Sequence, residues 1–242
     1  MNRVICWFSR GATSAVAAYL ALKKYPDAEL VYIDTHSEHP DGERFQRDVE
    51  AWLGKKVTVM ASTEYKDVDD VIEKRRYLRG RQGAPCSGLL KKAVRFAYQL
   101  PDDKHVFGYH AKEKRRVKDF IENNPELDLW FPLIDAQLDH SDCLAMLSRV
   151  GIEIPEMYKL GFNNNNCLGC VKAESPAYWN LTRQHFPAVF AKRAQQEREL
   201  DYALCRVNKQ PVFLDELDPA LGLGQSVNEP SCGMLCEIAL SQ

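Results

Sequence analysis

The first 60 residues alternate short apolar runs with helical patterns, and this alternation constrains the fold more than any other feature. Residues 4–8 form an apolar run that ends at Ser9, and residues 14–24 follow with an alanine-rich amphipathic pattern. Further apolar runs at 30–33 and 57–60 flank a second helical pattern, which predicts a helix over 41–53. Strands that alternate with helices in this way predict an α/β fold with a doubly wound, mostly parallel sheet and helices on both faces.

The pattern becomes helical and loop-rich after about residue 140. Helices are predicted at 68–78, 87–100, 143–150, 175–183 and 187–202, and strands at 105–109 and 130–134. Pro132 places the last strand at an edge or a strand end, because proline cannot donate to a central ladder. We predict an α/β domain over residues 1–140 and a helical, cysteine-containing region over residues 141–242, packed on that domain.

Composition limits the kinds of partner. The formal charge is -2, which gives no overall attraction to nucleic acid, and the basic runs at 74–81 and 112–116 have the spacing of solvated helix faces. No apolar stretch approaches the ~20 residues of a membrane span. We therefore expect a cytoplasmic protein without a membrane partner. In that compartment the 8 cysteines indicate metal or redox chemistry rather than disulfides.

A loop of small residues connects the first predicted strand to the first predicted helix. Backbone N–H groups of such a loop, together with the helix N-terminus, can bind a phosphate, and Ser9, Gly11, Thr13 and Ser14 suit that role. The alternative is an ordinary turn in which Thr13 or Ser14 caps the helix. The loop is not a Walker A motif, because it has no Gly-Lys-Ser/Thr at the required spacing.

The loop from Ser9 to Ser14 resembles the PP-loop of the PAPS reductase and adenine nucleotide α-hydrolase-like superfamily, whose members include PP-loop ATP pyrophosphatases. Four further stretches agree in order and context. They are Ile33-Asp34-Thr35 with Glu38-His39-Pro40, Pro85 to Lys91, Gly108 to Glu113 with Arg116, and Phe131-Pro132-Leu133. The iron–sulfur members of this superfamily, such as those of DNA phosphorothioation, are the most similar.

The resemblance implies roles for residues beyond the loop. Asp34 and Thr35 would lie beside the nucleotide, which is ATP or, in a reductase, PAPS or APS. Lys91 and Arg116 would contact phosphate or sulfate oxygens, and Glu113 would orient Arg116. Arginine suits this role as a bidentate fork and lysine as a point charge.

Three positions of the loop depart from the pyrophosphatase pattern. Arg10, Ala12 and Thr13 stand where that pattern has Gly, Lys and Asp. Losing the acidic residue weakens the case for ATP cleavage with Mg²⁺, because a side chain that could help to position the ion is missing. Reductases of the superfamily also lack the Lys and the Asp. Arg10 either replaces part of the lost charge or faces solvent.

A Cys-x-x-Cys motif at Cys167 and Cys170 follows a run of four asparagines that predicts a loop. Two thiolates at this spacing can bind one metal centre or form a redox pair. By resemblance to the iron–sulfur members, we predict a [4Fe-4S] cluster, with zinc as the alternative. The expected ligands are Cys86, Cys143, Cys167 and Cys170. Cys6 and Cys205 are expected in the core as small apolar residues.

A further cysteine pair lies near the C-terminus. Reductases of the family end in Glu-Cys-Gly-Leu/Ile-His, and Ser231-Cys232-Gly233-Met234 matches this motif loosely, without its Glu and His. Cys232 is therefore a candidate sulfur nucleophile with Cys236 as its resolving partner. Alternatively, both thiols stay reduced and pack an apolar turn.

These features predict an adenine nucleotide-dependent enzyme of sulfur transfer. In the preferred version, ATP is split between its α- and β-phosphates to activate an acceptor for sulfur, as in tRNA thiolation or DNA phosphorothioation. The alternatives are a PAPS or APS reductase that releases sulfite, and a nucleotide-sensing subunit without turnover. A cysteine desulfurase or a thioredoxin is the expected sulfur or electron partner. A nucleic acid is a candidate final acceptor, and a homodimer is compatible with the sequence.

Overall fold

The computed structural model describes residues 2–80, 83–222, 224–225 and 227. The chain forms two compact units that interleave along the sequence. The first consists of Met1–Asp34, Pro40–Ala61 and Val94–Pro155, and the second of Thr35–His39, Ser62–Ala93 and Glu156–Gln242. The predicted domain boundary after residue 140 stays a prediction, and we describe each unit by itself.

A five-stranded parallel sheet forms the centre of the first unit, in the order β3-β2-β1-β4-β5. The strands are β1 (Val4–Phe8), β2 (Glu29–Asp34), β3 (Val57–Ala61), β4 (Lys104–Phe107) and β5 (Asp128–Trp130). The central strand β1 pairs with β2 and β4, and Trp7 lies opposite Val31 on one side and Phe107 on the other. The predicted α/β class and the parallel sheet are confirmed.

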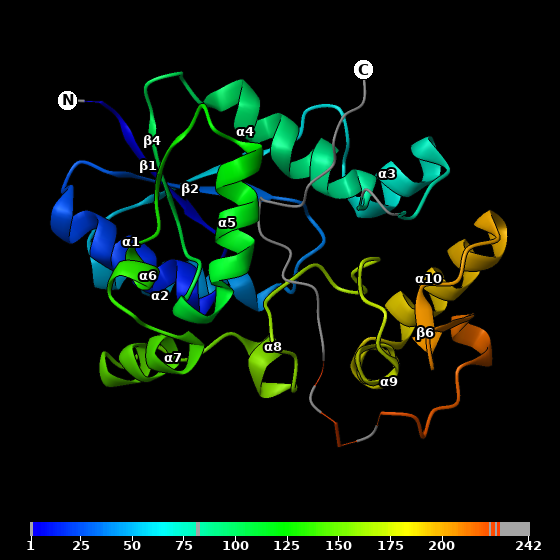
Figure 1. Ribbon diagram of the computed structural model, residues 1–242. Helices are drawn as coiled ribbons and strands as arrows, with labels where there is room; N and C mark the ends of the chain where they lie inside the picture. The colour runs from blue at the N-terminus through cyan, green and yellow to red at the C-terminus, as the bar shows by residue number, and fades with distance from the viewer. Residues whose placement is uncertain (1, 81–82, 223, 226, 228–242) are drawn as a thin grey trace. The chain divides into compact units, whose positions relative to one another are not determined.

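Helices cover both faces of this sheet (Figure 1). The helices α1 (Ala12–Lys24), α2 (Asp41–Leu53), α6 (Pro132–Asp135) and α7 (His140–Arg149) lie on one side, and α4 (Ala93–Tyr98) and α5 (Lys114–Asn123) lie on the other. Five alanines of α1 are completely buried, namely Ala12, Ala15, Ala17, Ala18 and Ala21. Their small side chains let α1 pack closely in the first unit, where it contacts β1 and α7.

The last predicted strand of the first unit lies at an edge of the sheet, as predicted, but its bounds are wrong. The sequence pattern predicts a strand over 130–134, whereas β5 ends at Trp130 and the short helix α6 begins at Pro132. Proline is favourable at the first position of a helix, where its missing N–H would have no helical partner and its fixed φ suits the helix. Pro132 therefore starts an element of another type rather than ending a strand.

The second unit is mainly helical. It contains α3 (Val68–Arg75), the π-helix η1 (Ser87–Lys92), α8 (Glu156–Lys159), α9 (Pro176–His185), α10 (Pro187–Leu200) and the 3₁₀ helix η3 (Leu214–Glu216). The fully buried Tyr178 and Trp179 belong to its core. An antiparallel hairpin of β6 (Cys205–Val207) and β7 (Gln210–Val212) was not predicted. Its turn residues Asn208 and Lys209 both have positive φ, as a two-residue type I′ turn requires.

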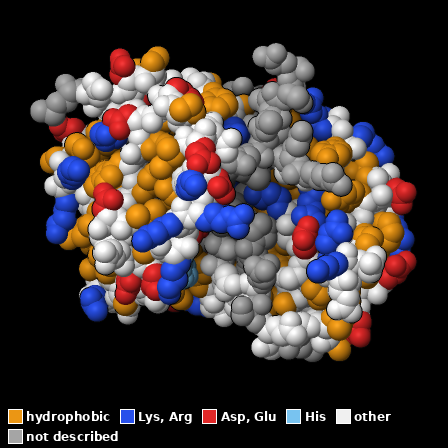
Figure 2. Space-filling view, viewed as in Figure 1, with side chains coloured by type: hydrophobic (Ala, Val, Ile, Leu, Met, Phe, Trp, Pro, Cys, Tyr) orange, Lys and Arg blue, Asp and Glu red, His pale blue; other side chains and the backbone are white. Residues whose placement is uncertain are grey.

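No helix in the described ranges is long and apolar enough to cross a membrane. On the face of the molecule seen in Figure 2, basic and acidic side chains are interspersed. This distribution agrees with the formal charge of -2.

Candidate functional site

The predicted phosphate loop lies between the end of β1 and the start of α1. The Ser14 hydroxyl organises it, because its oxygen accepts hydrogen bonds from the backbone N–H groups of Ser9, at 3.0 Å, and Gly11, at 3.3 Å. The same hydroxyl lies 2.9 Å from the Gly11 carbonyl oxygen, to which it can donate. Ser14 thus caps α1 and also shapes the loop in front of it, so the two interpretations of this segment are compatible.

The loop follows the strand at which the direction of chain winding changes. From β1 the chain winds outward to β2 and β3, and it later returns to place β4 on the other side of β1. In open α/β sheets, ligands bind outside the carboxyl ends of the strands at such a switch point. The loop therefore lies where this topology favours ligand binding.

Gly108 brings the end of β4 against this loop. A Cβ atom at Gly108 would lie 2.8 Å from the Cα and 2.9 Å from the backbone nitrogen of Ser14. These contacts are too short for any side chain, and the atoms concerned belong to backbone that cannot move aside cheaply. Glycine at this position therefore fixes how closely β4 approaches the phosphate loop.

Arg10 turns its side chain into the first unit, contrary to the expectation that it faces solvent. Its backbone has φ +55°, which is uncommon for a residue with a side chain. Its guanidinium lies 3.9 Å from the ring centroid of Tyr32, and its Nε donates to Gln46 at 2.9 Å. Its Nη1 lies 4.0 Å from the Asp34 carboxylate. With only 7% of its surface exposed, Arg10 does not face solvent, and a contribution of its charge to phosphate binding stays a prediction.

Glu113 contacts Arg116, as the resemblance implied. The two side chains form an ion pair, and Glu113 also accepts a hydrogen bond from the backbone N–H of His110 at 3.1 Å. The Arg116 guanidinium lies 4.9 Å from the ring centroid of Tyr109. This arrangement holds the guanidinium close to the segment that follows β4. Any contact of Arg116 with phosphate stays a prediction.

His140, at the start of α7, lies near this group and was missed by the sequence analysis. Its ring centroid is 6.4 Å from that of His110, and burial lowers the pKa of His140. No signal in the sequence indicates this proximity, because His110 and His140 are 30 positions apart, 140 minus 110.

A second group of polar side chains lies in the second unit, around Glu38. The Glu38 Oε1 atom lies 3.4 Å from the Lys91 Nζ and 3.7 Å from the Cys167 Sγ. The Thr35 hydroxyl oxygen is 3.1 Å from the same sulfur. Glu38 thus connects Lys91, which was predicted to contact phosphate or sulfate, with Cys167, which was predicted to bind a cluster. Glu38 itself belonged to the matched Glu38-His39-Pro40 stretch, but no role was predicted for it.

The Cys-x-x-Cys loop is held firmly by the helices of this unit. Gly169 has φ +61°, and a Cβ atom there would lie 2.6 Å from a methyl group of Val189. The Arg193 Nε donates to the Gly169 carbonyl at 2.9 Å, and the backbone N–H of Cys170 donates to the Tyr178 hydroxyl at 2.7 Å. The loop conformation therefore depends on both a glycine and a buried arginine.

The predicted cluster ligands fall in both units. Cys167 and Cys170 are buried in the core of the second unit, and Cys86 packs against that core. Cys143 lies in the first unit, on α7, where burial raises its pKa to about 12. Within the described ranges, no three Cys, His, Asp or Glu side chains are grouped as they would be around a metal ion. The [4Fe-4S] cluster and its zinc alternative stay predictions, and no chemistry below depends on either.

The two cysteines expected in the core lie one in each unit, Cys6 in the first and Cys205 in the second. Cys6 and Cys205 are completely buried, as expected for small apolar residues. Burial raises the pKa of Cys6 to about 12 and that of Cys205 to about 11. The predicted nucleophile Cys232 and its partner Cys236 lie outside the described residues.

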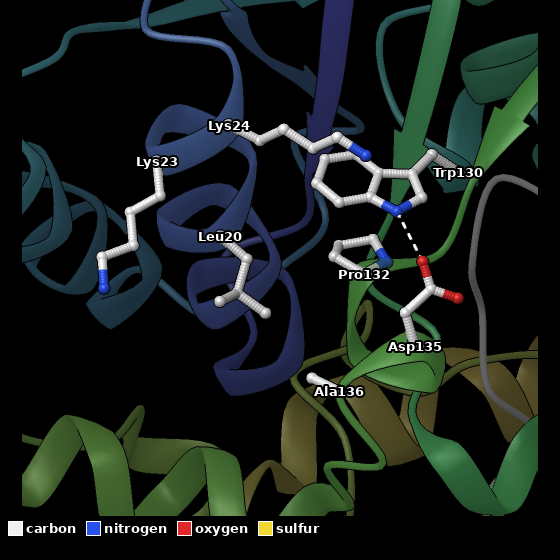
Figure 3. A pocket seen from close by; sticks show the side chains of 7 residues that line it. All are labelled: Leu20, Lys23, Lys24, Trp130, Pro132, Asp135 and Ala136. Atoms are coloured by element: carbon white, nitrogen blue, oxygen red, sulfur yellow. Dashed lines mark hydrogen bonds between the residues drawn. The ribbon is translucent and has the colours of Figure 1, made fainter.

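A shallow hollow of the first unit lies away from the phosphate loop. Figure 3 shows the Lys24 ammonium group over the Trp130 ring, 4.6 Å from a ring centroid, and the indole N–H directed at Asp135, to which it donates at 2.8 Å. Lys23 and Lys24 end α1, about 18 Å from its first residues at 1.5 Å per residue. The hollow is therefore separate from the candidate phosphate site.

The first unit is an α/β fold in which a loop of small residues follows the central strand at the switch point of a parallel sheet. The family model of the phosphoadenosine phosphosulfate reductase domain matches residues 3–176. The chain belongs to this family.

Among solved structures, the chain resembles a phosphoadenylyl-sulfate (PAPS) reductase from Candida auris in complex with phosphate. The TM-score is 0.53 at 15% identity, and the match covers 69% of this chain and 82% of the reductase. At this identity the likeness shows the fold. No curated protein is detectably similar to the chain in sequence.

Proposed function

We propose that this protein is an adenine nucleotide-dependent sulfur-transfer enzyme that binds the phosphates of its nucleotide at the loop from Ser9 to Ser14. The observation that carries the proposal is the position of this loop at the switch point, where Ser14 organises the backbone and Gly108 allows β4 to approach it. Backbone N–H groups and the N-terminus of α1 supply hydrogen bonds and a favourable dipole for phosphate oxygens. Membership of the reductase family supports an adenine nucleotide as the ligand.

The preferred reaction activates an acceptor with ATP. An acceptor oxygen attacks the α-phosphorus, the bond to the bridging oxygen of the β-phosphate breaks, and pyrophosphate leaves. A sulfur nucleophile then displaces AMP from the adenylated acceptor. Arg116, paired with Glu113, and Lys91 are the cations proposed to stabilise charge on the phosphates. A [4Fe-4S] cluster and Mg²⁺ remain predictions that this step does not use.

Reduction of PAPS or APS is the second candidate, and the inward position of Arg10 favours it. The usual lysine of the pyrophosphatase loop is absent, and Arg10 is engaged by Tyr32 and Gln46. The loop thus lacks a cation directed at a leaving pyrophosphate. In this reaction a cysteine thiolate attacks the sulfonate sulfur and displaces the nucleotide phosphate, and a dithiol partner then releases sulfite and becomes a disulfide.

Two assays separate these candidates. The protein is supplied with ATP, Mg²⁺ and a sulfur donor, and pyrophosphate is measured; in parallel it is supplied with PAPS or APS and reduced thioredoxin, and sulfite is measured. We expect pyrophosphate release that Lys91→Ala abolishes. Sulfite release without pyrophosphate release would select the reductase. ATP binding with neither product would leave the nucleotide-sensing alternative.

The loop itself is tested by binding. Isothermal titration of ATP against the intact protein and Ser14→Ala should show at least a tenfold loss of affinity in the variant, because two backbone N–H groups lose the oxygen that positions them. Val59→Ala, an exposed position on β3, is the matched control and should bind ATP like the unaltered protein. Equal affinity of all three proteins would contradict the proposed site.

A further inference from the structure

Arg95 on α4 is a completely buried arginine, and no carboxylate among the described residues pairs with it. Its Nη2 atom lies 3.5 Å from the side-chain oxygen of Asn124, at the outer limit of a hydrogen bond. Its Nε and Nη1 atoms are buried donors without an acceptor among the described residues. Burial lowers the pKa of Arg95 to about 10, and the exposed Glu126 opposes this effect. The guanidinium is therefore still charged at neutral pH.

His105 on β4 is also completely buried. Its Nδ1 atom accepts a hydrogen bond from the indole N–H of Trp7 at 3.0 Å, so the proton of the neutral ring is on Nε2. Burial lowers the pKa of His105 to about 4, which keeps the ring neutral at neutral pH. The Nε2 atom is buried without an acceptor among the described residues. His105 thus adds a further N–H donor to the interior of the first unit.

Ring contacts place Arg95 and His105 in the same layer, on the face of the sheet that α4 and α5 cover (Figure 1). Tyr98 follows Arg95 by one turn of α4, and its ring meets the Trp7 ring edge-on at 6.3 Å. The Trp7 ring in turn stacks on His105 at 6.0 Å. The Arg95 guanidinium lies 5.9 Å from the ring centroid of Phe120 on α5. After burial, the charge of Arg95 is the largest cause that lowers the pKa of His105.

We propose that the first unit binds one small monovalent anion of the chloride class between α4, α5 and β4, where the N–H groups of Arg95 and His105 hold it. Such an anion accepts hydrogen bonds and supplies the negative charge that the buried guanidinium needs, because an uncompensated buried charge is strongly unfavourable. A water molecule also accepts hydrogen bonds, but it has no charge, and its own hydrogens need acceptors. The complete burial of both residues favours a small ion over a nucleotide.

This anion site is separate from the proposed phosphate loop. His105 lies opposite Ile5 of β1, which precedes Ser9 by 4 positions, 9 minus 5. At roughly 3.3 Å per residue, this is about 13 Å along the strand. The anion would stabilise α4 and β4 whether or not a nucleotide is bound. Failure of the nucleotide proposal would therefore leave this one intact, and the reverse also holds.

Native-state hydrogen exchange of the full chain tests the proposal in urea at constant ionic strength. Chloride is increased while gluconate, an anion too large for a buried site of this kind, is reduced. If opening of the unit releases one anion, the opening constant of peptides covering residues 104–107 should fall about tenfold for each tenfold increase in chloride above its dissociation constant. Sodium keeps the cation constant throughout, so screening of surface charges does not change.

Arg95→Met removes the charge and keeps a long apolar side chain. Its opening constant should not respond to chloride. At low chloride this variant should be at least as protected as the unaltered protein, because replacing an uncompensated buried charge by an apolar group is commonly neutral or stabilising. Arg47→Met is the matched control, since it removes the same charge from an exposed position on α2. It should retain the full response to chloride.

Diffraction locates the anion without any variant. In crystals of the unaltered protein soaked in bromide, anomalous scattering should show one bromide ion beside Arg95 and His105. The alternative occupant is a water molecule, because the buried Oε1 of Gln99, one turn after Arg95, has no donor among the described residues. A water at this position in bromide-soaked crystals would overturn the proposal.

The exchange data can also overturn it. An opening constant that does not change with chloride would reject the anion, and an equal response in Arg95→Met would reject Arg95 as its ligand. If Arg95→Met does not fold, the response of the unaltered protein and the position of the bromide ion decide between the anion and water.

Discussion

The buried carboxyl group of Glu197 makes the stability of the second unit depend on pH. Glu197 lies on α10 with none of its surface exposed, and its oxygens accept hydrogen bonds from the backbone N–H groups of Leu204 and Leu214. It thereby ties the β6–β7 hairpin and η3 to the helix. Burial raises its pKa from 4.5 to about 7 and outweighs the lowering effect of the two backbone hydrogen bonds.

Whether stability rises or falls with pH depends on which state, folded or unfolded, binds the Glu197 proton more tightly. Because the pKa of Glu197 is higher in the folded than in the unfolded protein, the folded state holds more protons between about pH 4.5 and about pH 7. Stability is therefore greatest below this range, falls as the pH rises through it, and levels off above it. A shift of about 2.5 units corresponds to roughly 3 kcal/mol in total, of which roughly 2 kcal/mol is lost between about pH 5 and about pH 7.5.

Hydrogen exchange measures this loss where it occurs. Protection factors of peptides covering residues 204–217, corrected for the intrinsic effect of pH, should fall about 30-fold between about pH 5 and about pH 7.5. Glu197→Gln, which cannot ionise, should remove this fall. Glu199→Gln, at an exposed position of the same helix, should retain it. Identical pH dependence in the unaltered protein and Glu197→Gln would refute the reasoning.

Four further changes test the sites. Gly108→Ala should weaken ATP binding roughly tenfold, by titration, because its Cβ would lie 2.8 Å from the Ser14 Cα and overpacking costs about 1–3 kcal/mol. Gly169→Ala should destabilise the second unit by roughly 2 kcal/mol in urea unfolding, since it combines a positive φ with a contact to Val189. Arg10→Gly should lower the stability of the first unit by about 1–2 kcal/mol in the same assay, because relief of the positive φ offsets only part of the lost contacts with Tyr32 and Gln46. If the predicted iron–sulfur cluster is present, anaerobically purified protein has a band near ~400 nm that Cys170→Ser abolishes; four-thiolate zinc gives no band, and protein without either metal contradicts both predictions.

The strands β1, β2 and β3 were predictable because each is a short, mainly apolar run that lies next to a helical pattern. β1 is almost completely buried, and a buried parallel strand is apolar on both faces. The predicted helix over Asp41–Leu53 has the observed bounds. The pattern at 130–134 failed because Phe131, Leu133 and Ile134 suit a strand and a short helix equally, and four or five residues are too few to separate the two periods.

The candidate site was predictable as a set of segments but not as a set of contacts. The loop and the Glu113–Arg116 pair lie on adjacent or nearby residues, so local spacing was sufficient. The association of Glu38 with Lys91 and Cys167 joins residues that are 53 and 129 positions apart, 91 minus 38 and 167 minus 38. No periodic pattern reports a contact of that kind.

Arg10 shows that a departure from a motif can itself carry a structural signal. The superfamily pattern has glycine at this position, and an invariant glycine commonly marks a backbone conformation with positive φ. The observed φ of +55° agrees with this interpretation. A residue with a side chain costs free energy in that conformation, so it persists where surrounding contacts compensate. Replacement of the glycine by arginine should therefore have predicted an arginine anchored to its own unit, and its contacts with Tyr32 and Gln46 are such anchors. By the same reasoning, the side chain of Arg10 contributes to the architecture of the loop, and in the proposed nucleotide site the backbone of the loop and the cations on other segments are the other sources of attraction for phosphate.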